Sequence, residues 1–264
     1  MGRMIFLLVK RLLIGVILLS VGGVSAQSVQ VFYELSYRPN TQSEQVIRET
    51  MLLHHQMDTH QSWFRTHQIK DFDGFNVFIH KDFSNEIFWQ YQPIVYKIYK
   101  TTYSQEFQWN IENEHQNILG YKATKATTTF GGRSWTAWFT QELPLSDGPY
   151  KFRGLPGLIL EVISDDGEYQ FSFKGLEKIE KDIQLPSNAT LLKPTDLQKL
   201  KQNTMKNPSA QYSSSKQGGG YSVSVSFNGK QSTEKEIIES FEKEYIEWMK
   251  LHNNPIEKND IWLK

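Results

Sequence analysis

The 264-residue chain carries 29 basic and 29 acidic side chains, no cysteine, and 13% aromatic residues. Balanced charge excludes the strongly basic face that a nucleic-acid partner requires. The lack of cysteine excludes disulfides, a thiol nucleophile and the acylated cysteine of a bacterial lipoprotein. The length suits one β-rich domain with a substantial core.

Residues 1–26 have the pattern of a secretory signal peptide. A positively charged start precedes the uncharged stretch 12–24, which is shorter than the roughly 20 residues that span a bilayer. Small residues end that stretch, so we expect cleavage between Ala26 and Gln27. The mature chain, 27–264, then has 26 basic against 29 acidic residues, a formal charge of −3. We expect it in the periplasm or outside the cell, without a transmembrane span and not as a lipoprotein.

Before residue 180 most apolar side chains alternate with polar ones, as in half-buried antiparallel strands. Gly131-Gly132 and Asp166-Gly167 separate such runs and predict hairpin turns. Asn228-Gly229 closes a further run, 221–227. The alternating runs are Val31, Tyr33 and Leu35; the aromatic stretch 91–109 around Tyr96, Ile98 and Lys100; Trp135, Ala137 and Phe139; and Tyr169, Phe171 and Phe173.

Two helices are predicted after the strands. The first is short and polar, over 195–206. The second begins at a capping box, in which Thr233 and Glu236 each satisfy a backbone amide of the first turn, and ends before Pro255. Its apolar residues form one stripe. Between the helices, 207–220 is rich in serine and glycine and predicts a mobile surface loop. The stripe consists of Ile237, Ile238, Phe241, Tyr245, Trp248 and Met249.

These elements predict an α+β fold, mainly β: a curved antiparallel sheet or open barrel with a C-terminal amphipathic helix. We expect 27–264 to form a single domain.

The stretch Gly148-Pro149-Tyr150-Lys151-Phe152-Arg153, followed by Gly154-Leu155-Pro156-Gly157-Leu158-Ile159, resembles the signature of the GLPGLI family. Gly132 to Trp138 resembles a second signature of that family. The likeness covers roughly residues 118–180. It implies a secreted or envelope protein of Gram-negative bacteria with a β-rich fold, and no established activity.

Leu155-Pro156-Gly157-Leu158 predicts a type II β-turn, with Pro fixing φ and Gly supplying a positive φ. The turn is unusually apolar. It is either a tip that meets a ligand or partner, or a buried plug at one end of the sheet, with Gly148, Gly154 and Gly157 at tight turns. The glycines do not have the spacing of a phosphate-binding loop.

Cationic and aromatic side chains also gather around this motif. They could hold an anionic or sugar-like ligand by ion pairing and stacking. The alternative is that Trp135 packs inward and that Arg133 pairs with an acidic neighbour such as Glu142. The candidate binding residues are Arg133, Trp135, Trp138, Tyr150, Lys151 and Arg153, together with Leu155, Pro156 and Leu158.

The leading functional hypothesis is a non-enzymatic binding protein for an apolar or amphipathic, lipid-like molecule, or for an outer-membrane or envelope protein partner. No cofactor, metal ion or catalytic residue is expected. One alternative is a secreted hydrolase or metal-dependent enzyme that uses histidines of the stretch His54–His67. The adjacent His54 and His55 would point to opposite faces of a strand, so they could not bind the same metal ion, and this disfavours the metal-dependent enzyme. Another alternative is a carbohydrate-binding module that uses Trp135 or Trp138.

Overall fold

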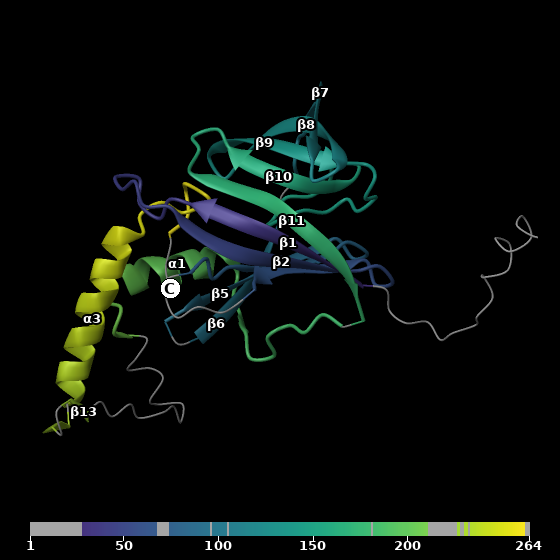
Figure 1. Cartoon of the computed structure of the whole chain (residues 1–264). Coiled ribbons are helices and arrows are strands. Elements are labelled where there is room, and N and C mark those ends of the chain that lie inside the picture. Colours follow the sequence, from purple (N-terminus) through teal and green to yellow (C-terminus); the bar gives the residue numbers. More distant parts are fainter. Residues whose placement is uncertain are drawn as a thin grey trace, which may run out of the picture.

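The structure, a computed structural model, describes residues 28–67, 74–95, 97–104, 106–180, 182–210, 226–227, 230–231 and 233–261. The predicted signal peptide with its cleavage site at Ala26 and Gln27, and most of the predicted loop 207–220, lie outside these residues. Within them the chain forms one open, strongly twisted sheet, with the two helices near one end of its strands (Figure 1).

The large sheet has twelve strands in the order β12-β6-β5-β4-β3-β2-β1-β11-β10-β9-β8-β7. All neighbours pair antiparallel except β12 and β6. The strands are β1 (Ser28–Tyr37), β2 (Ile47–Gln56), β3 (Gln61–Thr66), β4 (Phe78–Asp82), β5 (Ile87–Ile94), β6 (Lys97–Tyr103), β7 (Asn110–Ile118), β8 (Tyr121–Phe130), β9 (Arg133–Thr140), β10 (Leu158–Ser164), β11 (Tyr169–Ile179) and β12 (Thr190–Leu191); β13 (Ser226–Phe227) and β14 (Lys230–Gln231) form a separate pair.

The predicted alternation is confirmed in the central strands. In β1, Val31, Tyr33 and Leu35 are fully buried, whereas Phe32 and Glu34 are half-buried. The same alternation holds for Trp135, Ala137 and Phe139 in β9 and for Tyr169, Phe171 and Phe173 in β11. These side chains form the main core, so the prediction of a mainly β, α+β fold with a curved antiparallel sheet is confirmed.

The two predicted hairpins around residues 131 and 167 are also confirmed. Gly131 and Gly132, with φ of 60° and 77°, join β8 to β9, and Gly167, with φ of 70°, lies between β10 and β11. Asn228 and Gly229 lie outside the described residues. The aromatic stretch 91–109 is not one strand, because Val95 has a φ of 56° and reverses the chain between β5 and β6.

Both predicted helices are present, as α1 (Pro194–Lys206) and α3 (Glu234–Leu251). The capping box of α3 is complete: the Thr233 side chain accepts from the Glu236 amide, and the Glu236 carboxylate accepts from the Thr233 amide. Tyr245 of α3 and Leu197 of α1 pack with Ile94, where β5 ends. No helix in the described part of the chain is long and apolar enough to cross a membrane.

A small hollow borders the main core between Phe75, Gln90 and Tyr150 and measures about 20 Å³. That volume holds about one water molecule. It is too small for a lipid-like molecule, so a ligand of that kind requires another site.

Candidate binding site

The apolar motif between β9 and β10 is buried. Leu155 is 1% exposed, and Leu158 and Ile159 have no exposure. Gly154 and Pro156 are the exposed members of the hexapeptide. The interpretation as a buried plug is therefore correct, and Leu155 and Leu158 do not form an exposed tip. Their place in the core follows from β10, which begins at Leu158 inside the sheet.

The turn itself differs from the predicted type II turn. The Leu155 carbonyl accepts from the Gly157 amide at 2.8 Å, while the Leu158 amide donates to Leu143 at 2.9 Å. Because the Leu158 amide donates to Leu143, it does not make the hydrogen bond to the Leu155 carbonyl that closes a four-residue turn. Gly157 has a φ of +147°, and a Cβ atom there would lie 2.0 Å from the Thr140 carbonyl oxygen. Only glycine fits this close approach of two backbones.

A buried ion pair holds the same connection in place. Lys81 of β4 donates from Nζ to Oδ1 of Asp147 at 2.7 Å, and to the carbonyls of Gly148 and Phe152. His55 Nδ1 lies 2.9 Å from Oδ2 of Asp147. Burial alone would raise the pKa of Asp147, but Lys81 and His55 hold it well below its ordinary value. Asp147 therefore stays ionised, with each of its oxygens hydrogen-bonded, which a buried charge requires.

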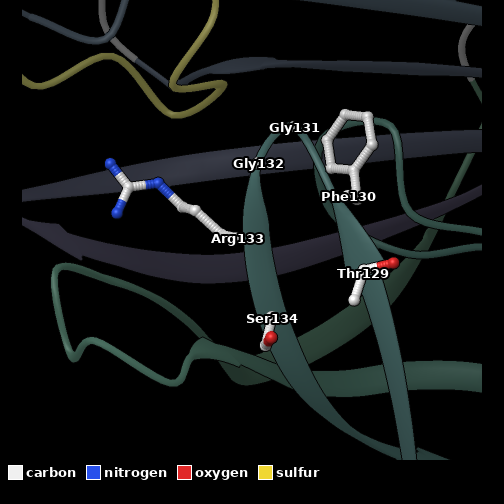
Figure 2. Close-up of a pocket in the computed structure, with 6 residues that line it drawn as sticks. All are labelled: Thr129, Phe130, Gly131, Gly132, Arg133 and Ser134. Atoms are coloured by element: carbon white, nitrogen blue, oxygen red, sulfur yellow. The ribbon is translucent and has the colours of Figure 1, made fainter.

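The Arg133 guanidinium is fully hydrogen-bonded within the protein. It has five N–H donors, and each has an acceptor. Figure 2 shows the Arg133 side chain extending away from Phe130. Both residues line a surface hollow of about 490 Å³ at the tip of the β8–β9 hairpin. Arg133 anchors the C-terminal segment to the β10–β11 turn, and Glu142 is not a partner. The acceptors are the carboxylates of Asp166 and Glu168, the Asn254 side chain and the carbonyls of Pro255 and Ile256.

The predicted aromatic residues divide between the two faces of β9. Trp135 is fully buried and its Nε1 donates to the Phe130 carbonyl at 2.9 Å, so it cannot stack on a sugar. Trp138 lies on the opposite face and is half-buried. Tyr150 is buried, and its hydroxyl donates to Glu257 at 2.6 Å. The carbohydrate hypothesis is thereby restricted to Trp138.

Lys151 is also buried and paired. Its Nζ lies 2.6 Å from Oε1 of Glu257 and 4.7 Å from the ring centre of Tyr103. Lys151 is therefore ion-paired with Glu257 inside the protein, next to the Tyr103 ring. It does not present its charge at the surface.

Arg153 is the predicted cation that remains half-exposed. Its guanidinium carbon lies 3.7 Å from the ring centre of Phe88, a stacking distance, and 5.7 Å from that of Phe107. Its backbone is fixed, because Trp109 Nε1 donates to the Arg153 carbonyl at 2.9 Å. Burial lowers the pKa of Arg153, while Tyr103 and other neighbours raise it. An arginine does not lose its proton in proteins, so this side chain is a fixed positive charge.

The rings around Arg153 form two groups that meet at its guanidinium, and together we call them the aromatic platform. Each member is half-buried and so keeps part of its ring accessible. Neighbouring ring centres lie 5.6 to 6.1 Å apart in the pairs Phe83–Phe88, Phe88–Tyr103 and Phe107–Trp109. The platform consists of Phe83, Phe88, Tyr103, Phe107 and Trp109, contributed by the β4–β5 turn, by β5 and β6, and by the segment before β7.

The Tyr103 hydroxyl is buried and has no hydrogen-bond partner among the described residues. Burial raises the pKa of Tyr103 well above its usual value, so the group is a neutral donor. Arg153 is the strongest charged influence on it and favours the ionised form. A buried hydroxyl without a partner costs free energy, and a ligand oxygen that reached it would recover that cost.

The histidines of the alternative hypothesis do not converge. His54 and His55 are neighbours on β2, paired with Trp63 and Ser62 of β3. His60, with a φ of 51°, lies in the turn after β2. In the described part of the chain, no three His, Asp or Glu side chains are grouped so that they could hold a metal ion.

Sequence reasoning found Arg153 and its neighbour Lys151 but missed the platform. Phe83, Phe88 and Tyr103 precede the stretch 148–159 by 45 residues or more, and no local pattern connects them to it. The only available signal was the aromatic density of 83–109.

Comparison with known proteins gives a short match to a family model and a similar fold. A family described as a protein of unknown function (Porph_ging) matches residues 132–161, a short segment that contains both motifs of the GLPGLI resemblance. No curated protein matches the chain.

Two solved structures of PNGF-II, in space groups C2 and P21, share the fold. They are 18% and 19% identical, each with a TM-score of 0.51, and cover 65% and 66% of this chain. The chain spans about a third of their length, 32% and 33%. An uncharacterized conserved protein from Thermus thermophilus matches with 9% identity and a TM-score of 0.39, over 64% of this chain and 91% of its own.

Proposed function

We propose that the protein is exported and acts as a non-enzymatic binding protein for an amphipathic molecule with an anionic group, held at the aromatic platform. The observation that carries this proposal is the position of Arg153, half-exposed and stacked 3.7 Å from the centre of Phe88. A guanidinium pairs with a carboxylate or phosphate through two parallel hydrogen bonds. The rings around it offer apolar area for the body of the same molecule.

Two features support an anionic rather than a neutral head group. The nearby cations Lys81 and Lys151 are buried, whereas the Arg153 side chain is half-exposed and can be reached from solvent. The Tyr103 hydroxyl can donate one more hydrogen bond to an oxygen atom. Apolar binding residues with a few placed polar groups are the usual composition of a small-molecule site.

The experiment is a titration of the purified protein with decanoate below its micellar concentration and with decanol below its solubility limit. Tryptophan fluorescence is the readout, because Trp109 belongs to the platform. We expect a saturable change with decanoate and at least tenfold weaker binding of decanol, since the charge-assisted pair contributes about 1.5–3 kcal/mol. Equal binding of both compounds, or binding of neither, would overturn the proposal.

A further inference from the structure

A second surface lies between helix α3 and the segment that joins β1 to β2, and we call it the α3 groove. It is a hollow of about 410 Å³ whose walls include Pro39, Ile47, Trp248 and Leu251. Leu251 is 52% exposed, and Ile47, on the other side, is half-buried. Both sides of the groove therefore present an apolar side chain. None of its lining residues belongs to the aromatic platform.

Hydrogen bonds between the two sides of the groove fix their relative position. Asn40 Nδ2 donates to the Lys250 carbonyl at 3.1 Å, the Asn254 amide donates to Pro39 at 3.1 Å, and Asn254 Nδ2 donates to Arg38 at 2.7 Å. These bonds join the end of α3 to the end of β1. A partner therefore meets a preformed surface and does not have to order it, which lowers the cost of binding.

The ionised side chains that line the groove are both acidic, Glu244 and Glu247. Glu247 lies 3.5 Å from Lys250, but both side chains are mostly exposed, 64% and 68%. An exposed pair of this kind contributes little stability, so a partner's cation can replace Lys250 at low cost. The groove is complementary to a partner that is both apolar and basic.

Glu244, Glu247 and Leu251 follow one another at spacings of three and four residues, and so line a single face of α3. Such a face presents an elongated strip rather than a compact pocket. We propose that the α3 groove docks a segment of a partner protein that carries both leucine-like and lysine- or arginine-like side chains. This inference goes beyond the proposed function, because it rests on a different surface and a different kind of partner.

The test measures the fluorescence anisotropy of a labelled peptide of alternating leucine and lysine as the protein is added. A leucine–glutamate peptide of the same length, which carries the opposite charge, is the control. We expect saturable binding of the basic peptide only. Leu251→Ser and the double variant Glu244→Gln/Glu247→Gln should each weaken it at least tenfold. Because Leu251 is half-exposed, its variant should retain the melting temperature of the parent.

Matched controls lie on the same helix. Ile246→Ser removes an apolar side chain that is 42% exposed but does not line the groove, and Glu234→Gln/Glu239→Gln removes two carboxylates elsewhere. Both should bind as the parent does. Equal loss in the controls, or equal binding of the acidic peptide, would overturn the inference. So would a dimer of the parent protein that Leu251→Ser converts to a monomer, because the occupant would then be a second copy of this chain.

Discussion

Nζ of Lys81 lies 2.7 Å from Oδ1 of Asp147, and neither side chain has any exposure to solvent. Lys81 belongs to β4 and Asp147 to the connection before β10, so the pair joins distant parts of the chain. It fixes the segment that places Arg153 on the aromatic platform. The stability of this pair is therefore a condition for the proposed site.

Lys81→Met should destabilise the protein by about 3–5 kcal/mol, because it leaves the Asp147 carboxylate buried without its cation. Urea unfolding at neutral pH measures the loss. The double variant Lys81→Met/Asp147→Leu should lose less than the two single variants together, since residues in contact are coupled. Strict additivity would show that the pair does not act as a unit.

Acid should destabilise the protein through its paired aspartates. Burial would raise the pKa of Asp166, but hydrogen bonds from Ser164 and Lys258 and the charge of Arg133 lower it to about 2. The pKa of Asp147 is lowered as well. An aspartate whose pKa is lower in the folded than in the unfolded protein stabilises the folded state at pH values above the unfolded-state pKa of about 3.9. This stabilisation is lost as the pH falls toward the folded-state pKa.

The free energy of unfolding should therefore fall between about pH 4 and pH 2. Asp166→Asn should flatten this decline, because the variant has already lost one contributing group. A decline as steep as that of the parent would show that Asp166 does not contribute.

Gly157→Ala should fail to fold or lose more than about 3 kcal/mol, because its Cβ would meet the Thr140 carbonyl oxygen and its φ of +147° is strained for alanine. Gly167 also has a positive φ, of +70°, but a Cβ there would meet nothing within 4 Å. Gly167→Ala should therefore cost only about 1 kcal/mol, the strain of the backbone alone. Thermal melts of the two variants distinguish contact from strain, and equal losses would refute the close approach at Gly157.

Leu155→Ala should cost about 2–5 kcal/mol, because it opens a cavity in the core. Pro156→Ala, at the exposed neighbour, should cost no more than about 1 kcal/mol. Chemical unfolding of both variants measures the contrast. A Leu155 variant with the stability of the parent would restore the interpretation of the motif as an exposed tip.

The fold was largely predictable because its signals are local. Alternation in β1 and β11, the hairpin dipeptides Gly131-Gly132 and Asp166-Gly167, and the capping box at Thr233 each depend on a few adjacent residues. For the apolar motif around Leu155, the sequence left two interpretations open, an exposed tip and a buried plug. Sequence alone could not decide between them, because the burial of Leu155 depends on which strands and loops surround it.

The candidate site was only partly predictable, because it depends on contacts across the sheet. No local pattern distinguishes Arg133 from Arg153, yet Arg133 donates to Asp166, Glu168 and Asn254, whereas Arg153 stacks on Phe88. Lys81 gave no signal at all, since its partner is 66 residues away. Residues of that kind become visible only when the register of the strands is known.

The most direct test of the account is the calorimetric affinity for decanoate of Arg153→Gln, with Lys122→Gln, at an exposed lysine of β8, as the control. We predict at least tenfold weaker binding for Arg153→Gln, with a melting temperature within a few degrees of the parent, and unchanged binding for Lys122→Gln. Undiminished affinity in the Arg153 variant, or an equal loss in both variants, would contradict a binding site at the aromatic platform.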